Sequence, residues 1–209
     1  MPQISPFDTH CDQYEQWFDE HLDVYLSEIE AICTLIPSHG KGVEIGIGTG
    51  RFALPLGIKY GVEPSREMRR LSSRKGLKVH DGIAEALPYQ DQSFDFALMV
   101  TTICFVDDVR KSFEEVHRIL KPGGCFIVGM VDKESPLGQT YLQMKNESAF
   151  YRVATFYSTE EVQKHLKEAG FGDFEFVQTV FGDLGEIDEV QTCRESFGDG
   201  GFVVIKATK

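Results

Sequence analysis

The stretch VEIGIGTG, residues 43–50, decides the fold of this chain. Three glycines alternate with small or apolar residues directly after the run GVEI (42–45), as is typical of a loop that follows a buried strand. Glycine at these positions permits tight turning and lets a ligand touch the backbone. Glu44 lies two places before the first glycine, where a carboxylate would repel a phosphate group. The loop therefore favours a ligand with a cationic centre.

Apolar runs and helical periodicity alternate on both sides of this loop. Strands are predicted at 42–45, 59–63, 77–81, 93–100, 125–131, 174–180 and 201–207. Helices are predicted at about 12–36, 51–56, 65–75, 109–120, 137–150 and 158–169. The alternation predicts an α/β fold: a Rossmann-like, doubly wound, seven-stranded sheet that is mostly parallel, with helices on both faces. No helix separates the last two strands, so one antiparallel edge strand is expected.

The composition limits the partners of the chain. Its 209 residues carry a net charge of −12, which argues against nucleic acid as a partner. No apolar run is long enough to span a membrane, and the N-terminus does not resemble a signal peptide. The five cysteines are odd in number and include no C-x-x-C pair. We therefore expect no metal site, no disulfide framework and a cytoplasmic protein.

Three further motifs follow the glycine loop in order: GVEPS (61–65), AEALPY with SFDFA (84–97), and RILKPGG (118–124). Together the four motifs resemble class I S-adenosylmethionine-dependent methyltransferases, most closely the type 11 group related to ubiquinone and menaquinone biosynthesis methyltransferases. The resemblance covers residues 40–131 and extends more loosely through 156–171. It implies a seven-stranded sheet whose last strand is antiparallel, S-adenosylmethionine as cofactor and S-adenosylhomocysteine as product.

The resemblance also implies a set of cofactor-binding residues: Glu44, Ile45, Gly46, Gly48, Gly50, Glu63, Pro64, Met68, Ile83, Ala84, Glu85 and Thr101. The glycines would wrap the methionine portion and the ribose. Glu44 would lie near the methionyl ammonium, through water or by supporting the loop, and the Glu63 carboxylate would accept hydrogen bonds from the ribose hydroxyls. Many relatives bind the adenine amino group with an aspartate where this chain has Ile83. That contact would come here from the backbone near Ala84 or from Glu85.

The acceptor pocket is expected to include Tyr14, Trp17, Cys104 and Asp132. Methyl transfer from a sulfonium is an in-line displacement, for which positioning and exclusion of water can supply most of the acceleration. The segment ICFVDD (103–108) lacks the histidines that relatives often carry there, so no catalytic residue is assigned. A general base is needed only if the acceptor arrives protonated.

We expect one domain over residues 1–209, with a helical lid at 1–40, a cofactor-binding core at 41–131, and substrate-side helices and final strands at 132–209. Residues 1–40 contain eight acids and no Lys or Arg. A lid of this charge near a cleft would favour a neutral or cationic small-molecule acceptor, such as an amine. In the competing interpretation, the acids face water and the aromatic residues only pack this segment on the sheet.

Two other functions remain open on the sequence alone. Residues 48–53, GTGRFA, also fit the G-x-G-x-x-A form of an NAD-dependent oxidoreductase, although two places late relative to the strand. A non-catalytic domain that binds S-adenosylmethionine would carry the same motifs. A comparison of S-adenosylmethionine with NADH as ligand separates the first alternative from a methyltransferase, and turnover separates the second.

Overall fold

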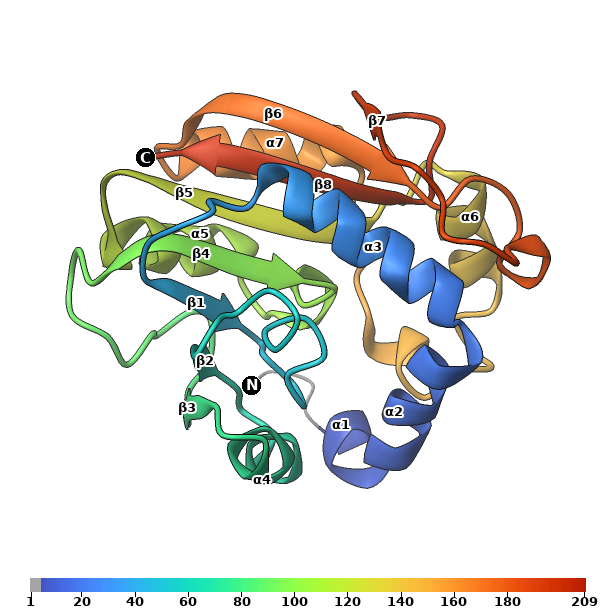
Figure 1. Ribbon diagram of the computed structural model, residues 1–209, viewed down its shortest axis with the longest axis horizontal. Coiled ribbons are helices and arrows are strands. Elements are labelled where there is room, and N and C mark those ends of the chain that lie inside the picture. The colour runs from blue at the N-terminus through green and yellow to red at the C-terminus, as the bar shows by residue number, and fades with distance from the viewer. Residues whose placement is uncertain (1–4) are drawn as a thin grey trace.

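The computed structural model describes residues 5–209, which form one eight-stranded sheet in the order β3-β2-β1-β4-β5-β8-β6-β7 (Figure 1). The strands are β1 (Gly42–Ile45), β2 (Tyr60–Val62), β3 (Lys78–His80), β4 (Phe94–Val100), β5 (Leu120–Val131), β6 (Gly172–Thr179), β7 (Arg194–Glu195) and β8 (Phe202–Thr208). Neighbours from β3 to β5 pair in parallel. Strand β8 pairs antiparallel with both β5 and β6, and β7 pairs antiparallel with β6 at the edge.

The predicted Rossmann-like, mostly parallel sheet is confirmed, with two differences in detail. The sheet has eight strands because the two-residue strand β7 pairs with β6, and two residues are too short to show a periodicity. The long antiparallel strand β8 lies between β5 and β6 and is not itself the edge strand. Antiparallel pairing therefore begins between β5 and β8, two strands in from the edge strand β7.

The helices cover both faces of the sheet, with α3 across one face and α5 and α7 on the other (Figure 1). Their bounds are α1 (Ser5–Thr9), α2 (Cys11–Glu20), α3 (Leu22–Leu35), α4 (Arg66–Arg74), α5 (Val109–Ile119), α6 (Pro136–Gln143) and α7 (Thr159–Glu168), with short 3-10 helices η1 (Ile103–Phe105), η2 (Tyr151–Val153) and η3 (Leu184–Glu186). Within residues 5–209, no helix is both long and apolar enough to cross a membrane.

Three of the helix predictions are corrected by the structure. The segment 12–36 is two helices, because His21 leaves helical backbone geometry between α2 and α3. Residues 51–57 form turns and no helix; Pro55 lies inside this segment and has no N–H to donate. Helix α6 ends at Gln143, well before the predicted end at 150. The capping box at Ser158 and Glu161 is confirmed at the start of α7.

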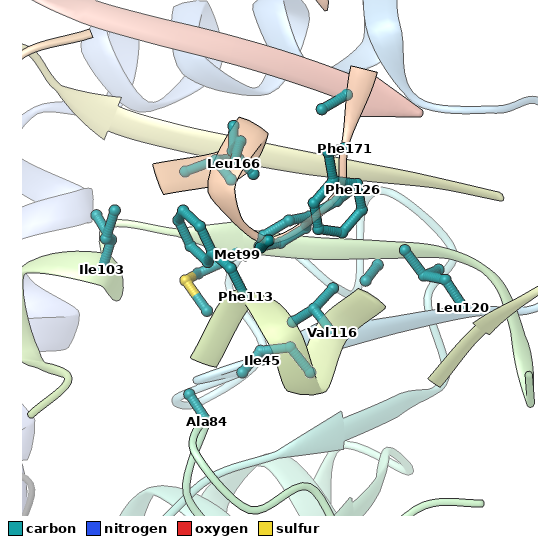
Figure 2. Packing of buried hydrophobic residues seen from close by; sticks show 14 of the residues in the cluster. Ile45, Ala84, Met99, Ile103, Phe113, Val116, Leu120, Phe126, Leu166 and Phe171 are labelled. Atoms are coloured by element: carbon teal, nitrogen blue, oxygen red, sulfur yellow. The ribbon is translucent and has the colours of Figure 1, made fainter. Parts of the chain in front are cut away.

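Two apolar clusters fix the sheet between its helices. On the α5 and α7 side, Phe113 packs against Phe126 with ring centroids 5.3 Å apart, and Leu166 and Phe171 belong to the same cluster (Figure 2). The second cluster includes Ile32 of α3, which is completely buried against the opposite face. Strands β1, β2, β4 and β5 run parallel, so their carboxyl ends lie at one edge of the sheet. Ligands bind at this edge in α/β sheets.

Candidate active site

A cavity of about 300 Å³ lies at the carboxyl ends of these strands. Its walls come from α1, α2, the loop after β1, the ends of β2, β4 and β5, the loop after β3, and the segment from α6 to residue 157. The residues that line it include three carboxyl groups, Glu28, Glu63 and Glu85, and none is a Lys, Arg or His. The cavity therefore presents only acidic ionisable side chains, apart from tyrosine and cysteine, to a bound molecule.

The glycine loop brings backbone to the wall of this cavity. Gly46 and Gly48 have φ of +72° and +54°, a region that favours glycine. A Cβ atom on Gly48 would point toward the Tyr14 hydroxyl of α2, 3.3 Å away, and one on Gly46 would lie 2.4 Å from Thr102. Gly50 does not line the cavity; a Cβ there would lie 2.3 Å from Leu77 in the core. The first two glycines thus shape the site, and the third allows close packing behind it.

Glu63 lies on the cavity wall just after β2, and its carboxylate is held by two backbone groups. Gly48 N–H donates to Oε2 at 2.9 Å and Ser65 N–H donates to Oε1 at 2.8 Å. Burial raises the pKa of Glu63 to about 7, although these two backbone hydrogen bonds favour its charged form. Each carboxylate oxygen retains a lone pair for a further donor. The group is therefore fixed in place and still able to accept two hydroxyl hydrogens.

Glu44 lies beneath the glycine loop and does not line the cavity. Its side chain is 1% exposed, and Oε2 has no hydrogen-bond partner within residues 5–209. Burial raises its pKa, and a backbone hydrogen bond from Ala53 partly offsets that effect. Of the two roles predicted for Glu44, this position favours support of the loop over contact with a ligand.

The loop after β3 places Ile83, Ala84 and Glu85 on the cavity wall. Glu85 Oε1 accepts the backbone N–H groups of Asp107 and Asp108 at 2.7 and 3.1 Å. The other oxygen, Oε2, is buried and has no partner in the described part of the chain. A buried acceptor without a partner is costly unless a ligand supplies the donor.

The end of β4 forms the middle of the cavity. Thr101 has a φ of +47°, unusual for a β-branched residue, and such strain is found most often at functional sites. Cys104 also lines the cavity and donates from Sγ to the Thr101 carbonyl at 3.2 Å. Burial raises the pKa of the Cys104 thiol to about 12, so it is protonated at neutral pH and is not a nucleophile.

Helices α1 and α2 lie against the glycine loop and its flank, and Tyr14 and Trp17 line the cavity from this side. The Glu15 carboxylate accepts the Thr49 hydroxyl and pairs with Arg51 at 2.9 Å. Asp8 of α1 accepts the Ser65 hydroxyl at 2.6 Å. Some of the acids before residue 40 thus anchor α1 and α2 to the segments after β1 and β2.

Asp132 stands apart from the other predicted pocket residues, because its side chain does not line the cavity. Its carboxylate is 3% exposed and accepts the Thr159 hydroxyl at 2.6 Å and the Glu134 N–H at 2.9 Å. These contacts connect the end of β5 to the start of α7. Across residues 5–209, no three His, Cys, Asp or Glu side chains gather closely enough to hold a metal ion.

The cavity residues that were not predicted include Glu28 of α3, Tyr141 of α6, Tyr151 of η2 and Phe156. The sequence contained a signal for the first of them. Glu28 falls three residues after Tyr25 and four before Ile32, so it interrupts the apolar stripe of that helix. An acid on the buried face of an amphipathic helix requires a partner or a function.

Comparisons with known proteins agree with this architecture. The family described as "Methyltransferase domain" matches residues 43–128. A protein of Methanocaldococcus jannaschii is 44% identical over 99% of this chain and 100% of its own length. A demethylmenaquinone methyltransferase of Chlorobaculum parvum is 30% identical over 68% of this chain and 69% of its own. The crystal structure of a SAM-dependent methyltransferase from Thermotoga maritima is 51% identical with a TM-score of 0.97, covering 99% of this chain and 100% of that one.

This chain belongs to the S-adenosylmethionine-dependent methyltransferases. It is an enzyme, and S-adenosylmethionine is its methyl donor. The resemblance to the menaquinone-biosynthesis group is confirmed through the more distant relative from Chlorobaculum parvum.

Proposed function

We propose that this methyltransferase acts on a neutral or cationic small molecule that is bound within the cavity. The observation that carries the proposal is the lining itself: three carboxyl groups and no basic side chain surround about 300 Å³ of space. A cation beside these groups favours their ionised form, even where burial raises the pKa as it does for Glu28 and Glu63. The resulting carboxylates attract a cation and repel an anion. The net charge of −12 disfavours nucleic acid as the acceptor in the same way.

The described residues fit S-adenosylmethionine at the β1 and β2 end of the cavity. Glu63 would accept the ribose hydroxyls, and the backbone at Gly46 and Gly48 would allow the close approach of the methionine portion. The buried Glu85 Oε2, which has no partner within residues 5–209, would accept a hydrogen bond from the adenine amino group. Glu85 Oε2 would thus make the polar contact to adenine that the apolar side chain of Ile83 cannot make.

The donor carries a methyl group on a positively charged sulfur, which is already activated for transfer. The chain then has to position the acceptor and exclude water, and this can supply most of the acceleration. The Tyr14 hydroxyl lies next to Gly48 of the glycine loop. Phe18 of the same helix is buried beside Tyr14, with the two ring centroids 5.1 Å apart. We propose that α1 and α2 act as a lid in this way, and we assign no general base.

The names of two relatives indicate the range of acceptors. The protein from Thermotoga maritima is called a "possible histamine N-methyltransferase", and that from Chlorobaculum parvum a demethylmenaquinone methyltransferase. The first name is that of an amine methyltransferase and the second that of a quinone methyltransferase. Because the first relative shares far more of its sequence with this chain, it supports an amine as the acceptor.

The test is methyl transfer from S-adenosylmethionine to three groups of small molecules: amines that include histamine, phenols, and carboxylic acids. We expect turnover of amines or phenols and none of carboxylic acids of the same size. Calorimetry with S-adenosylhomocysteine and NADH shows in parallel that the protein is folded and selects the expected cofactor. Preferred turnover of a carboxylic acid would refute the proposed acceptor class.

A further inference from the structure

Glu28 is the one carboxyl group of the cavity lining that the cofactor residues do not account for. It lies in the middle of α3, is 5% exposed and contributes to the cavity wall. Glu63 and Glu85 each accept two backbone N–H groups, whereas Glu28 has no hydrogen bond or ion pair within residues 5–209. A buried carboxyl group without a partner is costly, so its presence needs an explanation from function.

Two tyrosines and a phenylalanine of the same cavity lining form an aromatic group in the region of this carboxyl group. Tyr141 of α6 and Tyr151 of η2 are stacked with ring centroids 4.4 Å apart and an interplanar angle of 25°. The Phe156 ring lies 6.3 and 6.1 Å from these two rings. Glu28 is close enough to both tyrosines to act on them electrostatically, although burial is the largest cause of the raised pKa of each.

This group belongs to other elements of the cavity wall than Glu63 and Glu85. Glu63 and Glu85 follow β2 and β3, which are at one side of the sheet, while α3 and α6 contact or lie near β5 and β8 (Figure 1). The ends of β4 and β5, at Thr101 and Val131, line the space between them. A molecule held beside Glu28 therefore shares the cavity with the cofactor without competing for its carboxylates.

We propose that Glu28 binds a basic nitrogen of the methyl acceptor, whose carbon skeleton packs against Tyr141, Tyr151 and Phe156. The acceptor class is thus a small amine or a nitrogen heterocycle that carries an ammonium or N–H group. A carboxylate and aromatic faces together match such a cation, through a charge-assisted hydrogen bond and cation–π contact. A neutral ligand would not favour ionisation of Glu28, and an anion would oppose it. The inference rests on the proposed function and adds the residue that selects the substrate.

Proton exchange accompanies binding in this arrangement. Burial raises the pKa of Glu28 to about 8, so it is largely neutral at pH 7 in the free protein. The titratable groups that face it are Tyr25 on its own helix, Tyr141 and Tyr151, with Cys104 beyond Tyr151, and burial raises the pKa of all four. None of them supplies a positive charge at neutral pH. An ammonium ligand would be the first cation beside Glu28 and would drive its ionisation.

The experiment is calorimetric titration of the full chain, saturated with S-adenosylhomocysteine at pH 7, with phenethylamine, histamine and 2-phenylethanol. The wild type should bind the amines at least tenfold more tightly than the alcohol. Glu28→Gln should lower amine affinity tenfold or more, while the affinities for the alcohol and for S-adenosylhomocysteine stay within twofold. Glu30→Gln, which removes an exposed carboxyl group of the same helix, is the matched control and should behave as wild type.

Titration in two buffers that differ in ionisation enthalpy adds a second readout. Amine binding to the wild type should release roughly one proton, and binding to Glu28→Gln should release none. An amine preference that survives Glu28→Gln, or a wild type that does not distinguish amine from alcohol, would overturn the inference. Glu28-dependent amine binding without methyl transfer to any amine would refute the amine as the methyl acceptor and leave Glu28 as a binding site for cations, whereas preferred turnover of a carboxylic acid would refute the proposed function.

Discussion

Glu28 should make the stability of the free protein depend on pH in a way that one substitution removes. The pKa of a carboxyl group of this type is ordinarily 4.5, and burial raises that of Glu28 to about 8. Between pH 4.5 and about 8, Glu28 is therefore protonated in the folded state and ionised in the unfolded state. Stability is fully present below pH 4.5 and is lost as pH rises toward 8. Glu28→Gln keeps the shape and removes the titration.

The magnitude follows from the size of the pKa difference. One pH unit of differential protonation corresponds to about 1.4 kcal/mol, so the interval from 4.5 to about 8 corresponds to about 5 kcal/mol. The cavity beside Glu28 is wide enough to admit water, which hydrates the carboxylate and makes this figure an upper bound. We therefore expect Glu28→Gln to be about 2–5 kcal/mol more stable than wild type at pH 8.5. The two proteins should have the same stability near pH 4.5.

Urea unfolding followed by circular dichroism at pH 5, 6, 7 and 8.5 measures this difference without any ligand. Glu63, whose pKa burial also raises, is present in both proteins, so its contribution cancels in the comparison. Glu30→Gln should follow the wild type at every pH, because its carboxyl group is exposed. Parallel stability curves for wild type and Glu28→Gln across this range would refute the reasoning about the buried carboxyl group.

The remaining predictions concern the cofactor end and the proposed lid. Glu63→Ala should weaken S-adenosylmethionine binding roughly ten- to hundred-fold by calorimetry, as about 1.4–2.8 kcal/mol implies; unchanged affinity would mean that other groups hold the ribose. Gly48→Val should abolish that binding in a protein that still folds, since the new side chain points at Tyr14 within the cavity; normal binding and melting would contradict this assignment. Arg51→Ala removes the ion pair to Glu15, so amide exchange in α2 should become faster while exchange in β4 stays constant.

The cofactor end could be predicted from the sequence because its residues lie in short motifs directly after strands. Once the order of strands is known, the backbone alone brings the glycine loop, Glu63 and Glu85 to one edge of the sheet. Of the predicted cofactor residues, only Glu44 and Gly50 do not line the cavity. Glu44 is buried and accepts a backbone hydrogen bond from Ala53, and Gly50 allows close packing against Leu77. A motif fixes where the chain turns, and the direction of each side chain depends on packing.

The acceptor end could not be predicted in this way, because packing between distant segments creates it. Glu28 shares the cavity lining with Tyr141 and Tyr151 although α3, α6 and η2 are far apart in the sequence. Asp132 is a second residue whose side-chain direction could not be predicted from the sequence. Val131, the last residue of β5, lines the cavity, while the side chain of Asp132 turns away and accepts the Thr159 hydroxyl.

The stability cost of Glu28 is itself an argument about function. A neutral side chain at this position would make the free protein more stable above pH 5, because a buried carboxyl group without a partner favours the unfolded state there. Glu63 and Glu85 each receive two backbone hydrogen bonds from the fold, which reduces the same cost. At Glu28 the aromatic wall provides none. We propose that the group that completes this site arrives with the substrate, and a cationic donor is the partner that also favours the ionised carboxylate.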